Sequence, residues 1–389
     1  MSVEIVSLGC RLNLSESESL RALLAGADDL VVVNSCAVTA EAVRQTRQAI
    51  RRARKARPDA RLLVTGCAAE VERAAIAAMP EVDGLIANAA KLDPRAWNLP
   101  ARPWQPPQQH SRAFVAVQNG CDHACTFCVI PQGRGPSRSL PVAQVLREVE
   151  RHCAAGAREV VLTGVDLTGW GHDLGEMRLG LLVAAILEAF PSLPRLRLSS
   201  LDGIEIDTAL FELLAGEPRV MPHVHLSLQH GDDLILKRMK RRHLRGDAVR
   251  LVERLRARRP GIAVGADLIA GFPTEDEAAH RANLSIVREF DIVHGHVFPY
   301  SPRPGTPAAR MPQTAPAAIK ARAAELRGAV AETRAAWLRS LIGTPLEVLA
   351  ERDGTGHAPN FARVQLPAGI GAGELVSVTP TRLIEGLLA

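Results

Sequence analysis

Residues 118–139 read QNGCDHACTFCVIPQGRGPSRS and contain three closely spaced cysteines, Cys121, Cys125 and Cys128. Three and then two residues separate them, so three thiolates converge within one loop. No fourth cysteine lies nearby, and the next one, Cys153, falls in a predicted helix. Three protein thiolates on a four-iron cluster leave one iron open, whereas clusters that keep four cysteines only carry electrons. The spacing therefore predicts an iron–sulfur site at which chemistry takes place.

A zinc loop is the alternative for the same residues. Structural zinc is held by four closed ligands, usually in two closely spaced pairs. His123 is a possible fourth ligand, but it lies between two of the cysteines, where a short loop gives little freedom to close a tetrahedron. Plain structural thiols are a second alternative.

The pattern CxxxCxxC, with the aromatic Phe127 before the last cysteine, resembles the signature of radical S-adenosylmethionine (SAM) enzymes. The longer run GCDHACTFCVIPQGRGPSRS resembles one branch of that superfamily, the methylthiotransferases. The resemblance implies that Cys121, Cys125 and Cys128 are the catalytic cysteines. They would hold a [4Fe–4S] cluster whose fourth iron binds SAM.

The composition indicates a globular chain of two or three domains. Its 389 residues are 47% hydrophobic and of mixed charge. The net charge of +5 has the right sign for a polyanionic partner, although aromatic residues make up only 3% and stacking platforms are therefore few. Seven cysteines, with no signal peptide and no run of about twenty apolar residues, favour metal ligation in the cytoplasm and no membrane contact.

Three further cysteines, Cys10, Cys36 and Cys67, each follow a short β-branched run, VEIVSLG, LVVVNS and LLVTG. Helical stretches follow at 15–24, 40–56 and 70–78, so the pattern predicts an open parallel α/β sheet. Ligands of such sheets gather at the carboxyl ends of the strands, where all three cysteines fall. We therefore predict a second [4Fe–4S] cluster here. Three ordinary buried thiols are the alternative.

The same region narrows the resemblance. The runs SLGCRLNLSESE, NSCAVTAEAVRQTRQAIRR and TGCAAE are similar to the amino-terminal domain of methylthiotransferases. Arg11 and Asn13 look most like the branch that acts on tRNA N6-threonylcarbamoyladenosine. One basic helix face is either a phosphate contact or a solvated surface. It comprises Arg44, Arg47, Arg51, Arg52, Arg54 and Lys55.

The rest of the chain predicts three more segments after an amino-terminal domain at 1–97. These are a proline-rich linker at 98–112, a partial (βα)6 radical-SAM barrel at 113–341 and a small antiparallel β-barrel at 342–389, similar to the RNA-binding TRAM domain. The barrel strands are predicted at 114–118, 159–163, 195–200, 223–228, 262–271 and 292–300. Function is expected at their carboxyl ends.

Polar or glycine residues at these strand ends resemble the SAM site of the family. A SAM site needs glycine for close backbone approach, polar groups for ribose and carboxylate, and an apolar wall for adenine. Each residue alone has an ordinary explanation in turn geometry or capping. The candidates are Gly164, Asp166, Ser199, Ser200, Gln229 and Phe298.

Two further features have open interpretations. The run KRMKRRHLR at 237–245 is either a solvated helix end or an RNA-backbone contact. The TRAM-like segment offers only Phe361 as a stacking ring, so RNA binding there rests on resemblance. Cys153 is interpreted as a packed core thiol.

The resemblance implies a tRNA methylthiotransferase that cleaves SAM, removes hydrogen from carbon 2 of the modified adenine and inserts a methylthio group. Its partners would be tRNA, SAM and an external electron donor, and we expect a monomer. Isopentenyladenosine in tRNA and an aspartate of a ribosomal protein are the alternative substrates. A non-catalytic iron–sulfur or zinc RNA-binding protein is the alternative from another class.

Overall fold

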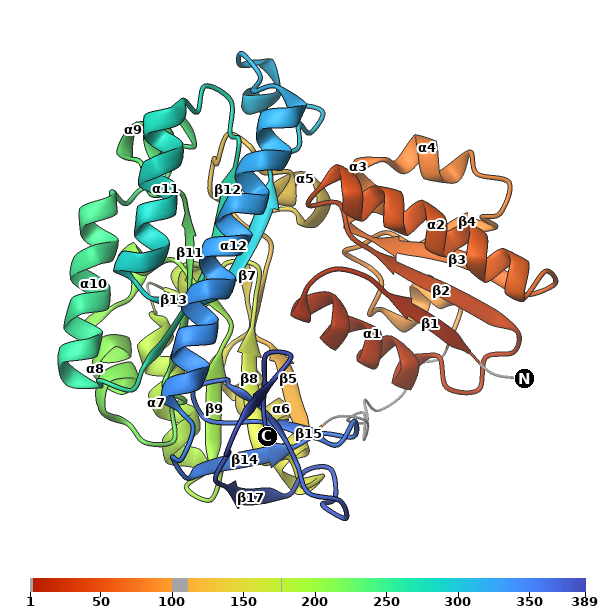
Figure 1. The fold of residues 1–389 in the computed structure, drawn as a ribbon. Coiled ribbons are helices and arrows are strands. Elements are labelled where there is room, and N and C mark those ends of the chain that lie inside the picture. Colours follow the sequence, from red (N-terminus) through yellow and green to blue (C-terminus); the bar gives the residue numbers. More distant parts are fainter. Residues whose placement is uncertain (1–2, 100–110, 176) are drawn as a thin grey trace. The chain divides into compact units, whose positions relative to one another are not determined.

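A computed structural model describes residues 3–99, 111–175 and 177–389 of the chain (Figure 1). The chain divides into two compact units. The first combines Met1–Gln108 with Gln118–Arg138 and Ser301–Ala309; the second combines Gln109–Val117, Ser139–Tyr300 and Arg310–Ala389. Most of the predicted linker at 98–112 lies outside the described residues. The three-cysteine loop thus belongs to the same unit as the amino-terminal cysteines.

The first unit is built on a parallel sheet in the order β1-β2-β3-β4. Its strands are β1 (Glu4–Ser7), β2 (Leu30–Ser35), β3 (Arg61–Gly66) and β4 (Gly84–Leu85). The first three are the predicted strands, and every residue of β2 is buried, as expected for a strand covered on both faces. The open parallel α/β sheet is confirmed.

Helices cover both faces of this sheet. Val32 packs with Leu20 of α1, whereas its neighbour Val33 packs with Ile50 of α2, because successive side chains of a strand point to opposite faces. The helices are α1 (Arg11–Leu23), α2 (Ala40–Ala56), α3 (Cys67–Val71), α4 (Arg73–Ala77) and α5 (Ile130–Arg134), with a 3-10 turn at Pro94–Trp97.

The helix predicted at 70–78 is instead two short helices, α3 and α4, interrupted at Glu72. The backbone of Glu72 leaves the helical region, with φ −120° and ψ 37°. Its carboxylate accepts hydrogen bonds from Arg47 (2.6 Å) and Arg303 (3.1 Å). Tertiary ion pairs therefore accompany a break that no glycine or proline signals in the sequence.

The second unit contains the predicted partial barrel. Its parallel strands pair in chain order within two sheets, β5-β8-β9 and β10-β11-β12-β13, with the predicted strand at 195–200 divided at Ser199. The strands are β5 (Arg112–Ala116), β8 (Glu159–Thr163), β9 (Arg195–Leu198), β10 (Ser200–Leu201), β11 (His223–Gln229), β12 (Ala263–Ala270) and β13 (Ile292–Pro299).

Helices surround these strands (Figure 1). They are α6 (Val142–Ala154), α7 (Leu179–Ala189), α8 (Thr208–Gly216), α9 (Asp233–Arg238), α10 (Arg245–Arg258), α11 (Glu277–Glu289) and α12 (Pro316–Ser340). Cys153 of α6 packs against the apolar core, as predicted. Among the described helices, none has both the length and the apolar character required to cross a membrane.

The chain ends in a small, mostly antiparallel sheet with the order β17-β14-β15-β16-β19-β18. Its strands are β14 (Leu346–Ala350), β15 (Thr355–His357), β16 (Arg363–Gln365), β17 (Leu375–Val378), β18 (Leu383–Ile384) and β19 (Leu387–Leu388). Buried Arg195 and Arg197 of β9 donate to backbone oxygens of His357 and Pro359, each at 3.1 Å. This sheet therefore docks against the barrel.

Phe361 takes part in this docking. Its ring stacks on His357 with centroids 4.5 Å apart, and the guanidinium of Arg197 lies 4.8 Å from its centroid. The only aromatic ring that the sequence offered for base stacking in this segment is thus used inside the protein.

Candidate active site

Cys10, Cys36 and Cys67 leave three adjacent strands at the same edge of the parallel sheet. Cys36 follows Ser35 and Cys67 follows Gly66, and these two preceding residues are paired in the register of β2 and β3. Burial, together with the nearby Cys10 and Cys67 thiols, raises the pKa of the Cys36 thiol to about 11. The structure thus brings the three predicted residues together from positions far apart in the chain.

Glycine lets the backbone approach these thiols closely. Gly9 has φ +98°, and a Cβ atom at this position would lie 2.9 Å from the Cys36 sulfur. Gly66, with φ +90°, lies against the backbone of Ser35, where a Cβ would meet the carbonyl oxygen at 2.4 Å. Both positions adopt the left-handed conformation that glycine tolerates best. The chain is therefore shaped around the cysteines.

The second trio lies on a loop that is closed at its base. The Cys121 amide donates to the carbonyl oxygen of Gly135 at 3.2 Å, and Gly120, with φ +76°, lies too close to Pro136 for any side chain. The Cys128 amide donates to Cys125 O at 3.2 Å, and the Cys128 sulfur accepts from the Ile130 amide at 3.4 Å.

Cys121, Cys125 and Cys128 are all half-buried, as accessible ligands should be. His123 has a ring nitrogen within 4.8 Å of the Cys121 sulfur. A set of three thiols and one imidazole is therefore the alternative that metal analysis must exclude.

The loop reaches the first cysteine set through its short helix α5. Val129, the residue after Cys128, shares a buried apolar cluster with Cys67. A Cβ on Gly133 would lie 3.2 Å from the Cys67 Cβ, and Asn88 donates to Gly133 O at 2.6 Å. Glycine at 133 therefore allows the loop to lie directly against a cysteine of the other set.

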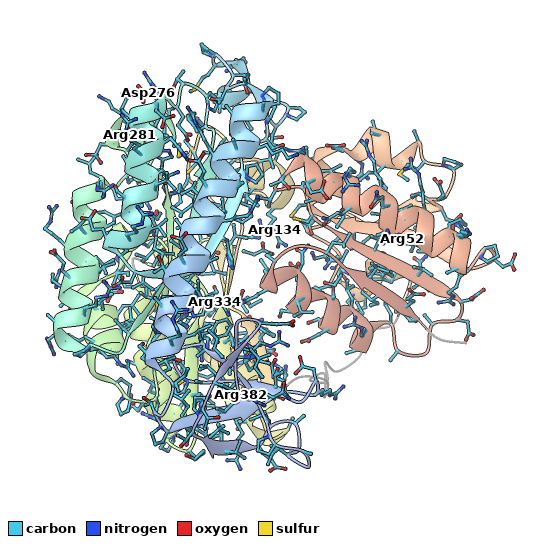
Figure 2. The ribbon with its side chains drawn as sticks, viewed as in Figure 1. Arg52, Arg134, Asp276, Arg281, Arg334 and Arg382 are labelled. Atoms are coloured by element: carbon cyan, nitrogen blue, oxygen red, sulfur yellow. The ribbon has the colours of Figure 1, made fainter. Side chains whose placement is uncertain are left out.

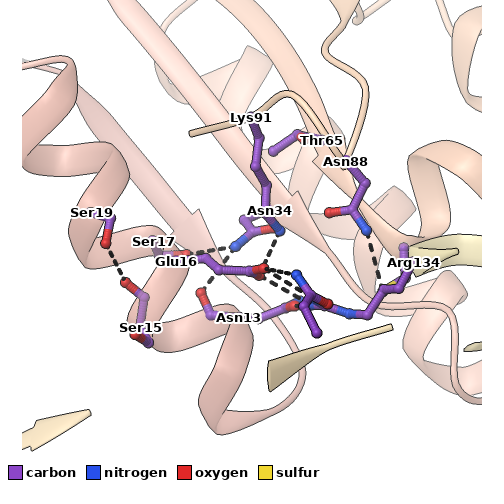
Figure 3. Close-up of polar contacts among 12 residues, drawn as sticks. Asn13, Ser15, Glu16, Ser17, Ser19, Asn34, Thr65, Asn88, Lys91 and Arg134 are labelled. Carbon is purple, nitrogen blue, oxygen red and sulfur yellow. Dashed lines mark hydrogen bonds and ion pairs between the residues drawn. The ribbon is translucent and has the colours of Figure 1, made fainter. Parts of the chain in front are cut away.

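A buried ion network connects Arg134 of the loop segment with Glu16 and Lys91 (Figure 3). Glu16, which is 3% exposed, accepts from Lys91 Nζ at 2.5 Å and from Arg134 at 2.9 Å. Arg134 also donates to Asn13 Oδ1, and Asn13 Nδ2 donates to Ser35 O at 3.0 Å, next to Cys36. The side chain that links the loop to the sheet is thus a buried, charge-paired arginine.

The electrostatics of this network suit a cluster of thiolates. Lys91 and Arg134 together exceed the single charge of Glu16 by one positive charge. Burial raises the pKa of Cys67, and the guanidinium of Arg134 acts in the opposite direction. Burial would also raise the pKa of Glu16, but Lys91 and Arg134 hold it below its usual range.

Net charge and hydrogen bonding are the factors by which a protein tunes an iron–sulfur cluster. Metal binding must also displace the protons that burial keeps on these thiols. The donor set of three converging thiols beside two buried cations fits a [4Fe–4S] cluster. Sequence reasoning missed Glu16, Lys91 and Arg134 because charged residues are almost always exposed, and nothing local marks these as exceptions.

The predicted SAM-contacting residues all lie at or near the carboxyl ends of barrel strands in the second unit. Ser199 is buried, and its hydroxyl has no hydrogen-bond partner among the residues that the structure describes. Gln229 ends β11 with an uncommon positive φ of 72°. The remaining predicted residues are Gly164 and Asp166 after β8, Ser200 at the start of β10 and Phe298 near the end of β13.

A polar cluster inside the same barrel was not predicted. Asp267 Oδ1 lies 3.1 Å from His225 Nε2 and 3.0 Å from His296 Nδ1, and Ser200 lies 3.5 Å from the other carboxylate oxygen. Burial opposes ionisation of Asp267, but hydrogen bonds from both histidines lower its pKa below the usual range. The sequence did contain a signal for this cluster: His223, His225 and Ser227 alternate along one strand, which places their polar side chains on the same face.

The basic run at 237–245 is mainly used inside the second unit. Arg241 pairs with Asp202 at 2.9 Å, and Arg242 pairs with Glu205 at 2.7 Å. Arg245 donates to the carbonyl oxygen of Gly231 at 2.9 Å. The sequence suggested either a solvated helix end or an RNA-backbone contact, and neither interpretation included these ion pairs and hydrogen bonds within the second unit.

Comparisons with known proteins agree with this architecture. Residues 115–283 match the radical SAM superfamily, and residues 2–87 match the uncharacterized protein family UPF0004. These two ranges contain the second and first cysteine sets, respectively.

Several curated proteins are similar over almost the whole chain. Threonylcarbamoyladenosine tRNA methylthiotransferase MtaB of Rickettsia prowazekii is 42% identical, covering 99% of this chain and 96% of its own length. The protein of the same name from Thermotoga maritima is 30% identical over 90% of this chain and 86% of its own length. A tRNA-2-methylthio-N6-dimethylallyladenosine synthase of Paracoccus denitrificans is 33% identical, with 99% and 95% covered.

Solved structures share the fold at lower identity. The radical SAM methyltransferase TsrM of Kitasatospora setae, solved with cobalamin and a [4Fe–4S] cluster, aligns with a TM-score of 0.53 at 18% identity. The alignment covers 76% of this chain and 68% of that one. The cobalamin-dependent SAM radical enzyme OxsB aligns with a TM-score of 0.51 at 10% identity, with 85% and 56% covered.

Proposed function

Because the chain belongs to the tRNA methylthiotransferase family of radical SAM enzymes, we propose that it converts N6-threonylcarbamoyladenosine beside the anticodon into its 2-methylthio derivative. Of the relatives named for this nucleoside, the Rickettsia prowazekii protein is 42% identical and the Thermotoga maritima protein 30%, against 33% for the dimethylallyladenosine enzyme of Paracoccus denitrificans. Arg11 and Asn13, at the start of α1 just after Cys10, resemble the branch that acts on the same substrate. An enzyme of this kind needs a [4Fe–4S] cluster and SAM.

The observation that carries the proposal is the convergence of two cysteine trios within one unit. We assign Cys121, Cys125 and Cys128 to the cluster that binds SAM, and Cys10, Cys36 and Cys67 to a second cluster. Contact between Gly133 and Cys67 supports this assignment, because it brings the loop of one trio against a ligand of the other. When bound, the first cluster supplies the electron for reductive cleavage of SAM.

The protein's own contribution is to hold, orient and shield the reactants. Arg134 and Lys91 compensate negative charge near Cys67 of the amino-terminal trio, and Glu16 pairs with both cations. In the barrel, we propose that Gly164, Asp166, Ser199, Ser200, Gln229 and Phe298 contact SAM. The unpartnered hydroxyl of buried Ser199 supports this role, since a buried polar group without a partner is costly unless a ligand completes it.

Further properties follow from this proposal. A tRNA substrate places the enzyme in the cytoplasm, and reductive SAM cleavage requires an external electron donor. We expect the protein to act as a monomer. The target nucleoside must leave its stack to be reached, as for other enzymes that modify a base.

Nucleoside mass spectrometry of tRNA from a deletion strain tests the substrate. We expect loss of 2-methylthio-N6-threonylcarbamoyladenosine, accumulation of its unmethylthiolated precursor and restoration by the wild-type gene but not by a Cys67→Ala gene. Loss of the isopentenyladenosine derivative instead would assign the protein to the other tRNA branch. If the tRNA nucleosides are unchanged and a ribosomal protein loses its methylthiolated aspartate, the protein belongs to the branch that acts on ribosomal proteins.

A second experiment separates the enzyme from a non-catalytic metal protein. Anaerobically reconstituted protein is incubated with SAM and a reductant, and 5′-deoxyadenosine is measured against a Cys125→Ala control. Iron analysis of the same sample should give about eight iron atoms per chain for two four-iron clusters. If the protein contains zinc in place of iron and forms no 5′-deoxyadenosine above the control, the proposal that it is a radical SAM enzyme is refuted.

A further inference from the structure

A cleft of about 330 Å³ opens between helix α2 and the segment at 301–309 in the first unit. Four arginines and one glutamate provide the charges along its walls. We propose that this cleft binds a backbone phosphate of the tRNA substrate. Its lining residues are Ala40, Val43, Arg44, Arg47, Gln48, Arg51, Glu72 and Arg303.

Helix α2 presents its charged face to the cleft because its apolar face is buried in the sheet. Val43 and Ile50 lie in the core, whereas Arg44, Arg47 and Arg51 follow one another at spacings of three and four residues. Side chains at these spacings share one stripe of a helix. The stripe therefore places three guanidinium groups along a single wall.

The opposite wall contributes Arg303, which is only 3% exposed. It donates to Glu72 Oε1 at 3.1 Å, and its Nε has no hydrogen-bond partner among residues 3–99, 111–175 and 177–389. Ser301, two residues earlier, accepts from the Ala40 amide at 3.1 Å and so attaches this wall to the start of α2. A buried guanidinium with an unused donor indicates a missing acceptor.

The charge balance favours an anion. Four arginines against Glu72 leave three positive charges on the lining residues. Arg47 also pairs with Glu72, and Arg44 pairs with Glu41 outside the cleft at 2.5 Å. The Arg44 and Glu41 side chains are 59% and 53% exposed, and ion pairs this exposed are weak, so a phosphate can replace the carboxylate. Guanidinium is the group best suited to phosphate geometry.

The inference rests on the proposed function, because the tRNA supplies the anion. Phosphate contacts position a nucleic acid without reading its bases. Each contact releases counterions, so binding must weaken with salt in proportion to the number of contacts. The cleft would therefore hold the tRNA in register while other residues recognise the nucleoside.

The test compares two double variants of the reconstituted full-length protein by fluorescence anisotropy with labelled tRNA over a range of salt concentrations. Arg44→Gln with Arg51→Gln removes two charges from the cleft. Arg52→Gln with Lys55→Gln removes two charges from the same helix at exposed positions that do not line it (Arg52 is labelled in Figure 2). Circular dichroism checks that both variants remain folded.

We expect the cleft variant to bind tRNA roughly tenfold more weakly at low salt and to lose about one unit of salt slope per removed contact. The tRNA affinity of the control variant should stay within about twofold of that of wild type. Salt screens the interaction between a phosphate and an exposed charge more than about 8 Å away. The cleft variant should lose the same factor of affinity for substrate tRNA and for non-substrate tRNA. Production of 5′-deoxyadenosine from SAM without tRNA should be unchanged.

Other outcomes overturn the inference in distinguishable ways. If both double variants bind alike while the methylthiolated nucleoside still forms, the cleft is not a phosphate site and the proposed function stands. If the loss is confined to substrate tRNA, the cleft recognises something other than the backbone. If wild-type protein shows no salt-dependent tRNA binding, both the inference and the proposed function fail.

Discussion

Arg134 and Glu16 are 118 residues apart in the sequence and form a buried ion pair with a distance of 2.9 Å between Nη1 and Oε1. Arg134 follows Cys128 on the loop, and Glu16 follows Cys10 on α1, so the pair connects the segments that carry the two cysteine trios (Figure 3). A charge pair taken out of water is stable only while both partners are present. The pair thus helps to fix the relative placement of the two trios, together with the bond from Asn88 to the Gly133 carbonyl oxygen.

Replacing one partner of this pair should destabilise the protein strongly. Arg134→Gln leaves Glu16 with Lys91 alone, and Glu16→Gln leaves two buried cations unpaired; each should cost about 3–5 kcal/mol in the free energy of unfolding. Denaturant unfolding followed by circular dichroism measures this cost. The matched control is Arg95→Gln, which breaks an exposed pair with Asp93 and should leave the free energy of unfolding almost unchanged. Equal effects at both sites would contradict the structural role of the buried pair.

Cys67→Ala should remove one cluster and leave the other. Iron should fall from about eight to about four atoms per chain, because each four-iron cluster depends on its own trio. The protein should still produce 5′-deoxyadenosine from SAM but form no methylthiolated nucleoside. Cys153→Ala serves as the control, since this thiol packs against the core of the second unit and should leave the iron content unchanged. Full iron retention in Cys67→Ala would rule out Cys67 as a ligand.

The protein should lose stability in mild acid through His294. Burial lowers the pKa of His294 to about 3, and the charge of Arg334 acts in the same direction. The ring makes edge contacts with the rings of Trp337 and Phe361. Unfolding restores an ordinary pKa near 6.5, so the unfolded state binds the extra proton.

The stability contribution of His294 is therefore complete above pH 6.5 and declines by about 1.4 kcal/mol per pH unit as pH falls toward 3. Between pH 7 and pH 5, the free energy of unfolding should fall by about 2 kcal/mol less in His294→Gln than in wild type, as measured by denaturant unfolding. Exposed His172→Gln is the matched control and should keep the wild-type dependence. Parallel pH profiles for wild type and His294→Gln would refute the assignment.

Phe361→Ala should affect folding rather than RNA binding. The ring is occupied by His357 and Arg197, so its removal should cost about 3 kcal/mol of stability. Base stacking on an aromatic side chain is worth roughly 1–3 kcal/mol per base, so a role in RNA binding would lower tRNA affinity at least several-fold. We expect affinity within about twofold of wild type, measured under conditions in which the variant is folded. A larger loss would show that the ring is available to RNA.

Local patterns in the sequence predicted the elements that carry the site. Strand β2 (Leu30–Ser35) and helix α2 (Ala40–Ala56) have the predicted bounds, because continuous β-branched runs and a 3.6-residue apolar period are properties of short segments. Parallel pairing then places Cys10, Cys36 and Cys67 at one sheet edge without further information. Helix α5 and the break at Glu72 were not predictable, because each depends on side chains distant in the chain.

The amino-acid sequence alone therefore determined the two cysteine trios, the parallel sheet and the barrel, since spacing and hydrophobic period act over a few residues. Only the tertiary structure decided which charges are buried. In the sequence, Arg134, Glu16 and Lys91 cannot be distinguished from surface residues, and only folding excludes water from around them. Arg241 was a candidate for contact with RNA, but in the structure it pairs with Asp202. The energy of a charge depends on its surroundings, and those surroundings are assembled from distant parts of the chain.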